Sequence, residues 1–396
     1  MLQGKTALIG VCGGIAAYKV CELISRLRGA GADAVCVMTR SAAEFITPLT
    51  LGTLTQNNVY CDMFAPPANY EVEHVSLAKR ADIIVIIPAT ANIIGKLASG
   101  IADDMLTATV TASAAPKLIA PAMNTQMYEN PVVQKNINTL TGFGYEFVPP
   151  KSGRLACGDV GCGALADIDI IFGKIEKILT EKKDLAGKKV VVTAGPTREA
   201  IDKVRFITNH SSGKMGYAVA RAAYNRGADV VLISGRVALP PVYGVKTVYV
   251  DSALDMYDAV SKHAIGADII VKSAAVGDFR PVDAYDGKLK KDKFKIIELT
   301  ENPDILAELG RMDGRFVLVG FAMETENMEA NTLKKMKEKN CDIMVANDLN
   351  VEGAGFGMDT NVVTIFEKNG SVTKYDIMSK DALADIILDK AAKFER

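Results

Sequence analysis

The sequence lacks the features that would place this protein in a membrane or on a nucleic acid. No apolar run approaches the ~20 residues that a membrane-spanning helix needs. Met1–Lys5 leads straight into a strand pattern, so we expect no signal peptide. The formal net charge of −1 argues against a nucleic-acid-binding protein with a broad basic face, and any bound phosphate must be held locally. We therefore expect a soluble cytoplasmic protein with no membrane or nucleic-acid partner.

Cysteine occurs an odd number of times, seven, and without a CxxC pair. Disulfide frameworks and zinc ribbons depend on such paired spacings, so we expect a reducing compartment in which most thiols are small core side chains. Cys157 and Cys162 have four residues between them, but no further Cys or His lies near in sequence. A zinc site would need two more ligands, and we predict no metal site built from protein side chains.

Short apolar runs alternate with helical segments along the whole chain. This alternation is typical of α/β folds, and 396 residues are too many for one ordinary core. We predict two doubly wound, Rossmann-like domains, residues 1–181 and 188–396, joined by the polar linker Lys182–Gly187. The predicted strands are 6–11, 34–38, 82–87, 117–120 and 145–148 in the first domain, and 190–193, 229–234, 246–250, 268–272, 316–321, 342–346 and 362–366 in the second.

Two glycines, Gly13 and Gly14, follow the first predicted strand. Without side chains there, a ligand phosphate can approach the backbone closely. A complete GxGxxG is absent, and the second strand ends in Thr39, Arg40 and Ser41 instead of the acidic residue that binds the ribose of NAD. The NAD interpretation is thereby weakened, and the hydroxyl-rich strand end suits a phosphate such as that of FMN.

Further polar residues follow later strands of the first half, where doubly wound sheets bind their ligands. Thr90 and Asn92 follow one strand, and Pro121–Tyr128 (PAMNTQMY) follows another. The segment 100–107 (GIADDMLT) starts a helix and ends in Thr107. Its two acidic residues are equally well explained as partners of the helix dipole.

His74 is one of three histidines and precedes an apolar helical pattern. A lone histidine near a helix start is more often structural than catalytic. Lys151–Gly163 (KSGRLACGDVGCG) is glycine-rich and lies between a strand and the next helix. We interpret it as a mobile flap that carries one reactive thiol, and we assign Cys162 a structural role.

The second half is organised around Arg205–Ala220 (RFITNHSSGKMGYAVA), a small-residue and polar loop that opens onto a helix. The N-terminus of a helix presents backbone N–H groups and a partial positive charge to an anion. Thr208 and Met215 stand where a P-loop needs Gly and Ser or Thr, so this is not a P-loop. An ordinary capped turn between strand and helix remains the alternative.

Other polar clusters of this half follow strands or start helices. Asp278 lies just past a strand end, and Pro303 suits the first turn of a helix. Lys335 and Lys339, four residues apart, share one helix face and have the geometry to hold a polyphosphate. The run 288–291 (KLKK) is a cationic loop whose plain interpretation is a solvated surface.

These motifs occur in a family order. The second half contains TAGPTRE, NHSSGKMG, AAVxDFR, KxKK, NPDI, GFAxET and AND, and the first half contains PxMNxxM and GxLACG. In this order they closely resemble bacterial bifunctional coenzyme A biosynthesis proteins, over residues 4 to about 392. Tyr128, Gly277 and Met323 depart from residues common in relatives, but none of these changes removes a chemical group.

The resemblance implies a flavodoxin-like, FMN-dependent phosphopantothenoylcysteine decarboxylase in residues 1–181 and a CTP-dependent phosphopantothenate–cysteine ligase in residues 188–396. The ligase would join 4'-phosphopantothenate to cysteine through an acyl-cytidylate, with magnesium arriving on CTP. The decarboxylase would convert the product to 4'-phosphopantetheine. The family also implies a homo-oligomer, with trimers of flavin domains and dimers of ligase domains, which a dodecamer would combine.

The resemblance also implies roles for single residues. His74 would be the decarboxylase base, Asn124 would hold the substrate carboxylate, and Cys157 would protonate the product. Lys288 would stabilise the first transition state of ligation, and Asn209 would orient the acyl group in the second step. The implied FMN contacts are Gly13, Gly14, Thr39, Ser41, Thr90, Asn92 and Thr107. The implied CTP contacts are Ala274, Ala275, Asp278, Lys288, Asn302, Pro303, Asp304, Ile305, Phe321, Lys335 and Lys339.

Two rival interpretations come from other functional classes. An NAD(P)-dependent oxidoreductase with two Rossmann-like domains would be expected to carry the missing GxGxxG and acidic residue. A non-enzymatic flavoprotein regulatory subunit would have no need of Lys288 or the NHSSGKMG loop.

Overall fold

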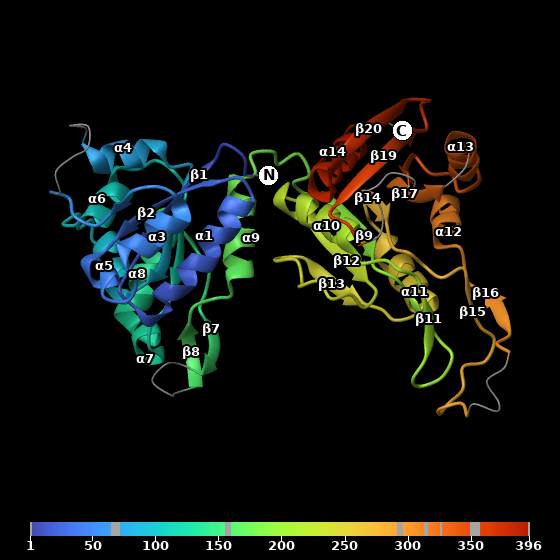
Figure 1. Cartoon of the computed structure of the whole chain (residues 1–396), viewed down its shortest axis with the longest axis horizontal. Helices are drawn as coiled ribbons and strands as arrows, with labels where there is room; N and C mark the ends of the chain where they lie inside the picture. The colour runs from blue at the N-terminus through green and yellow to red at the C-terminus, as the bar shows by residue number, and fades with distance from the viewer. Residues whose placement is uncertain are drawn as a thin grey trace. The chain divides into compact units, whose positions relative to one another are not determined.

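The computed structural model describes residues 2–64, 72–154, 160–290, 296–312, 316–324, 327–348 and 357–394. The chain forms two compact units, Met1–Glu181 and Lys182–Arg396, each built from a sheet with helices on both faces (Figure 1). None of the helices among the described residues has the length and apolar character needed to cross a bilayer.

Unit 1 contains a six-stranded parallel sheet in the order β3-β2-β1-β4-β5-β6. This is the order of doubly wound dinucleotide-binding folds, and removing the two-residue edge strand β3 leaves the order of flavodoxin-like folds. The fold class predicted for this half is therefore confirmed. The strands are β1 (Thr6–Val11), β2 (Asp33–Met38), β3 (Val59–Tyr60), β4 (Ile83–Ala89), β5 (Lys117–Pro121) and β6 (Glu146–Phe147).

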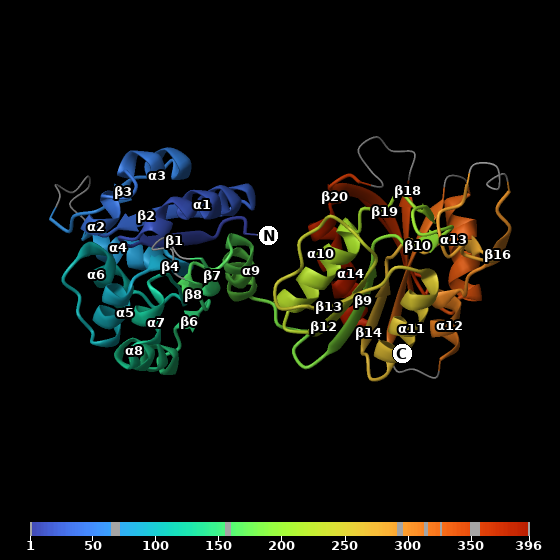
Figure 2. The same ribbon diagram turned by 90° about the horizontal axis from the view of Figure 1, so that it is seen from below.

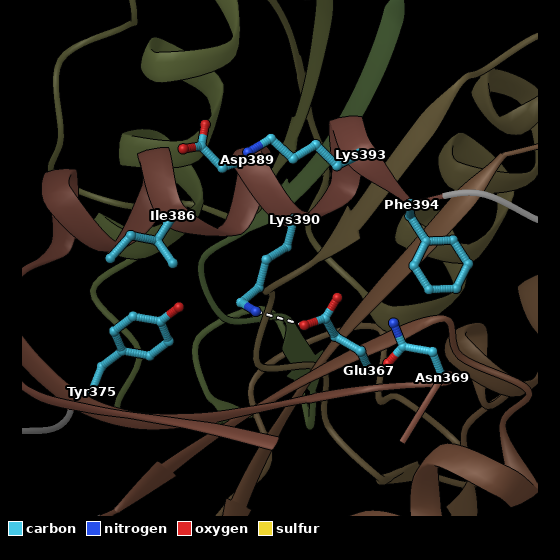
Figure 3. Close-up of a pocket in the computed structure, with 8 residues that line it drawn as sticks. All are labelled: Glu367, Asn369, Tyr375, Ile386, Asp389, Lys390, Lys393 and Phe394. Atoms are coloured by element: carbon cyan, nitrogen blue, oxygen red, sulfur yellow. Dashed lines mark hydrogen bonds and ion pairs between the residues drawn. The ribbon is translucent and has the colours of Figure 1, made fainter. Parts of the chain in front are cut away.

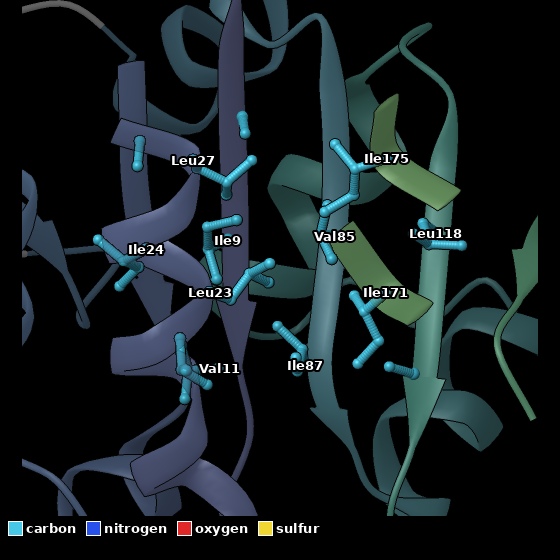
Figure 4. Packing of buried hydrophobic residues seen from close by; sticks show 14 of the residues in the cluster. Ile9, Val11, Leu23, Ile24, Leu27, Val85, Ile87, Leu118, Ile171 and Ile175 are labelled. Carbon is cyan, nitrogen blue, oxygen red and sulfur yellow. The ribbon is translucent and has the colours of Figure 1, made fainter. Parts of the chain in front are cut away.

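The helices of unit 1 cover both faces of this sheet. They are η1 (Ile15–Lys19), α1 (Val20–Gly29), α2 (Arg40–Ala43), α3 (Pro48–Thr55), α4 (Glu73–Arg80), α5 (Ala91–Ala98), α6 (Met105–Ala112), α7 (Thr125–Glu129), α8 (Pro131–Gly142) and α9 (Ile168–Leu179). Side chains alternate between faces along a strand, and Figure 4 shows Ile9 and Val85 packed under α1 and α9. The neighbouring residues Leu8 and Ile84 pack on the opposite face with α4, α5, α6 and α8.

The segment predicted to be a mobile flap begins and ends in strands. Its ends form an antiparallel hairpin of β7 (Lys151–Arg154) and β8 (Val160–Ala164). A glycine-rich sequence carries no alternation of apolar and polar residues, so this pairing gave no strand signal. Cys157, predicted to be the reactive thiol, lies outside the described residues.

Unit 2 contains an eight-stranded sheet in the order β13-β12-β9-β14-β17-β18-β19-β20. The strands from β13 to β18 pair in parallel, whereas β19 and β20 add antiparallel to the edge. The seven predicted strands are present, which confirms the fold class, and β20 was missed. The sheet strands are β9 (Lys189–Ala194), β12 (Asp229–Ser234), β13 (Lys246–Tyr249), β14 (Ile269–Lys272), β17 (Val317–Glu324), β18 (Ile343–Asp348), β19 (Thr360–Glu367) and β20 (Val372–Ser379).

The two faces of this sheet carry different helices. α10 (Lys214–Asn225) and α14 (Lys380–Lys393) pack on one face. α11 (Ala253–Ala264), α12 (Ile305–Arg311) and α13 (Met328–Glu338) contribute to the core of the other face (Figure 2). Two small hairpins stand beside the sheet: β10 (Arg198–Ala200) with β11 (Phe206–Thr208), and β15 (Phe279–Pro281) with β16 (Leu299–Glu301).

Residues 182–187, predicted to be a linker, pack against unit 2. Leu185 is buried in the core beside α10 and α14. The Asp184 carboxylate pairs with Arg226, which donates to it from Nε at 2.9 Å and from Nη2 at 2.6 Å. The Lys183 ammonium donates to the backbone oxygen of Asn225 at 2.7 Å.

Candidate active sites

Unit 1 contains a cleft of about 510 Å³ at the carboxyl ends of β1, β4 and β5. The chain connections diverge between β1 and β4, and this switch point is where doubly wound folds bind ligands. The cleft brings together four predicted site residues from distant parts of the sequence: Gly13, Gly14, Thr90 and Asn124. The other lining residues are mostly apolar, which is typical of a cofactor site with few orienting polar groups.

Gly13 and Gly14 have different structural roles in this cleft. A Cβ on Gly13 would lie 2.5 Å from Ser41 Cβ and 2.8 Å from the Ser41 backbone carbon, so only glycine fits there. A Cβ on Gly14 would have no heavy atom within 4 Å, so this position leaves the cleft wall open. Thr39 caps α2 by accepting a hydrogen bond from the Ala42 N–H at 3.2 Å, which places the start of α2 beside Gly13.

Four predicted flavin contacts are not among the residues that line this cleft: Thr39, Ser41, Asn92 and Thr107. Thr107 is fully buried, and it closes a capping box with Asp104, whose carboxylate accepts from the Thr107 N–H at 2.8 Å. Asp103 and Asp104 both pair with the Lys96 ammonium, at 2.6 and 2.9 Å. The two acidic residues thus have the helix-capping and ion-pair roles that are ordinary for such a segment.

The two decarboxylase candidates that the structure describes lie on different elements. Asn124 is the N-cap of α7, where its Oδ1 accepts from the Gln126 N–H at 2.9 Å, and it lines the cleft. His74 lies half-buried in the first turn of α4 and is not a lining residue of that cleft.

Unit 2 presents an open helix N-terminus at the carboxyl edge of its sheet. Gly213 precedes α10 with φ at 78°, and no side chain caps the helix. A Cβ on Gly216 would lie 2.5 Å from Ala194 Cβ, so the first turn of α10 packs directly on the end of β9. The NHSSGKMG loop therefore directs uncapped backbone N–H groups toward the edge where parallel strands bind ligands.

Hydrogen bonds join this loop to the other predicted clusters. Asn209 Nδ2 donates to the backbone oxygens of Ala275 and Val276 at 3.2 and 3.3 Å. Asn302 Nδ2 donates to the Gly277 oxygen at 2.9 Å, and the Asn302 N–H donates to the Asp278 oxygen at 2.8 Å. Asn209, Ala275, Asp278 and Asn302 thus belong to one connected group of loops, although they are far apart in sequence.

Two of the CTP candidates on the α12 side, Asp304 and Lys339, are in contact. Asp304 is the N-cap of α12, accepting from the Ala307 N–H at 2.9 Å, and its carboxylate pairs with the Lys339 ammonium. Pro303 and Ile305 flank that cap, whereas Lys335 lies exposed in α13. Phe321 in β17 is half-buried against the opposite core, on the α10 face.

A cation that the sequence reasoning missed, Lys272, ends β14 beside the buried Ala274. Its ammonium donates to the Ala274 oxygen at 3.4 Å. Burial lowers the Lys272 pKa, against the attraction of the Asp304 and Asp278 carboxylates. A lysine closing an otherwise apolar strand is the sequence signal that could have revealed it.

A second cleft, of about 520 Å³, lies between α14 and the strands β19 and β20 (Figure 3). A Glu367–Lys390 ion pair of 2.5 Å spans it. No residue of the predicted sites lines this cleft. Within the described ranges, no group of three His, Cys, Asp or Glu side chains has the geometry to hold a metal ion.

Residues 1–180 match the family described as Flavoprotein, and residues 185–394 match the DNA/pantothenate metabolism flavoprotein C-terminal domain. The chain is 49% identical to the coenzyme A biosynthesis bifunctional protein CoaBC of Bacillus subtilis (strain 168), over 99% of this chain and 98% of that protein. It is 40% identical to the protein of the same name from Escherichia coli (strain K12), over 98% and 97%. A crystal structure of the C-terminal domain of such a protein is 44% identical, covers 53% of this chain and 97% of its own, and has a TM-score of 0.47. The chain belongs to the family of bifunctional coenzyme A biosynthesis proteins, as the resemblance of its motifs predicted.

Proposed function

We propose that this protein ligates 4'-phosphopantothenate to cysteine at the carboxyl edge of the unit 2 sheet and decarboxylates the product beside the unit 1 cleft. The observation that carries the ligase assignment is the joining of the NHSSGKMG loop to the AAV and NPDI segments by hydrogen bonds from Asn209 and Asn302. The decarboxylase assignment depends on the cleft at the β1–β4 switch point.

The unit 1 cleft fits FMN by its shape and its donors. Gly14 leaves one wall open, Thr90 lines the cleft as the N-cap of α5, and the apolar lining suits an isoalloxazine ring. Bound FMN would oxidise the cysteinyl thiol, which provides the electron sink that carbon dioxide loss requires. Asn124 would hold the carboxylate that departs, because it lines the cleft and a side-chain amide can donate hydrogen bonds.

His74 and Cys157 would handle the protons of this reaction. A histidine titrates near neutrality and would accept the proton that leaves the substrate. A thiol is acidic enough to return a proton to the product. His74 does not line the cleft of its own chain, so we propose that it acts at the flavin bound by a second copy.

Exposed apolar side chains favour such an oligomer. Ile15 and Tyr18 border the cleft and are 62% and 61% exposed. In unit 2, the hairpin residues Phe206 and Phe279 are also exposed. Exposed apolar side chains at such sites favour an interaction surface. The trimers of unit 1 and dimers of unit 2 that we propose follow from the family resemblance alone.

Ligation would proceed in two steps. The 4'-phosphopantothenate carboxylate attacks the α-phosphate of CTP and pyrophosphate leaves. The amine of cysteine then attacks the resulting acyl-cytidylate, and CMP leaves. Lys288 would offset the charge that develops on the phosphoryl oxygens, and magnesium bound together with CTP would supply further positive charge there. Lys339, Asp304 and Phe321 would hold the nucleotide, and the uncapped start of α10 would bind an anionic group.

Product analysis by mass tests both activities. The protein is mixed with 4'-phosphopantothenate, cysteine, CTP and magnesium, and the expected products are pyrophosphate, CMP, carbon dioxide and 4'-phosphopantetheine. An unchanged mixture refutes the assignment. An absorption spectrum with flavin bands that NADH leaves unchanged excludes an NAD(P)-dependent oxidoreductase, and turnover itself excludes a regulatory subunit without enzymatic activity.

A further inference from the structure

We infer that Asp202 is a positioning residue for ligation. Together with Arg205 it hydrogen-bonds the backbone of the loop that carries Lys288, and this anchoring fixes the region that the Lys288 ammonium can reach. The inference rests on the proposed function of Lys288.

The Asp202 carboxylate is the centre of a compact hydrogen-bond cluster. Its Oδ1 accepts from the backbone N–H groups of Val204 and Arg205, both at 2.8 Å. Its Oδ2 accepts from Arg205 Nε at 3.0 Å and from the Leu289 N–H at 3.1 Å. Arg205 Nη2 also donates to Oδ2, so two guanidinium donors converge on one carboxylate oxygen in a charge-assisted pair.

The Asp202–Arg205 pair hydrogen-bonds both backbone groups of one loop residue, Leu289. While Asp202 accepts from the Leu289 N–H, Arg205 Nη2 donates to the Leu289 carbonyl oxygen at 2.9 Å. The backbone N–H of Lys203 donates to the Gly287 oxygen at 3.1 Å, which fixes the residue on the other side of Lys288. Lys288 therefore lies between two residues, Gly287 and Leu289, whose backbone groups are hydrogen-bonded.

Burial and charge explain why an ion pair serves as the anchor. The Asp202 side chain is 0% exposed, whereas Lys288 next to Leu289 is exposed. A buried carboxylate is kept only when it is paired, and the hydrogen bond from Arg205 holds the pKa of Asp202 far below its usual range. In the described part of the chain, Lys288 has no ion-pair partner of its own. The anchors of its backbone therefore limit the region that its ammonium can reach.

Position matters here because Lys288 acts as a point charge on a long side chain. Stabilisation of a developing charge depends on a group held in place before the reaction. A loop free to move would leave CTP binding nearly intact, because Asp304, Lys339 and Phe321 do not depend on it, but it would slow the first chemical step.

A double-mutant cycle tests this division. Pyrophosphate release is measured in a single turnover with CTP and 4'-phosphopantothenate for the wild type, Asp202→Asn, Lys288→Gln and the double variant. We expect Asp202→Asn to slow release at least about tenfold while changing the CTP affinity less than about twofold. The double variant should be no slower than Lys288→Gln, since residues that act through one group are not additive. Effects that multiply in the double variant overturn the inference.

Two further measurements separate positioning from general damage. Asp184→Asn breaks a different Asp–Arg ion pair of unit 2, the bidentate one with Arg226, and should leave pyrophosphate release unchanged. Hydrogen exchange at the Leu289 amide should accelerate in Asp202→Asn. An exchange rate equal to that of the wild type would refute the anchoring of the loop by Asp202. If Asp202→Asn does not fold, Arg205→Lys, which keeps the charge but not the fork, serves in the same cycle. Wild-type release by Lys288→Gln instead refutes the proposed function of Lys288.

Discussion

Replacing Gly13 by alanine tests the geometry of the flavin cleft most directly. The added Cβ would lie 2.5 Å from Ser41 Cβ and 2.8 Å from the Ser41 backbone carbon and oxygen. Because two of these atoms are backbone, no rotamer change relieves the clash, and the start of α2 or the cleft wall must shift. Such overpacking costs about 1–3 kcal/mol. For a domain of this size, that lowers the unfolding temperature of unit 1 by roughly 2–4 °C per kcal/mol.

Gly14→Ala is the matched control, because it adds the same methyl group one residue later. Gly14 has φ at −164°, an extended conformation open to any residue, and its added Cβ meets nothing within 4 Å. We expect its stability to stay within about 0.5 kcal/mol of the wild type. The assay is thermal unfolding without and with FMN, followed by circular dichroism and flavin fluorescence. Equal unfolding temperatures for both variants, or a larger loss for Gly14→Ala, would refute the packing argument.

The remaining predictions address each half separately. A fragment of residues 182–396 should ligate without binding flavin, because that unit has its own core; an insoluble fragment would contradict this. His74→Asn should accumulate phosphopantothenoylcysteine without releasing carbon dioxide, and normal carbon dioxide release would make His74 structural. Lys288→Gln should release pyrophosphate only at a small residual rate, whereas Asn209→Asp should release it and retain acyl-cytidylate; equal losses would contradict the division. Arg226→Met should destabilise unit 2 by about 1–3 kcal/mol, because Asp184 loses both hydrogen bonds from the buried guanidinium and the Asp385 backbone oxygen loses one, and unchanged denaturant unfolding would argue against this.

The sequence predicted the strands whose apolar residues follow directly from their burial. Strands such as β4 and β9 are buried on both faces, so their apolar runs mark them plainly. The hairpins β7–β8, β10–β11 and β15–β16 were missed, because their residues are glycine-rich, polar or exposed and show no regular alternation of apolar and polar residues.

The candidate sites were predictable only in part, for a related reason. Gly13, Gly14, Thr90 and Asn124 follow strands, and the topology brings strand ends together. The contact between Asp202 and Leu289 joins residues 87 apart within irregular segments. No periodicity or local motif signals such a contact, because it depends on how the loops are folded over the sheet edge.

The uncapped start of α10 links the stability of unit 2 to ligand binding. Gly213 has a positive φ, so a serine or aspartate there would be strained and the usual capping side chain is denied to this helix. An anion that binds the first turn would supply the missing acceptors and so complete the secondary structure itself. The bound substrate would then be part of the folded domain. Its concentration would set the free energy of unfolding of unit 2 and the resistance of the unit to proteolysis.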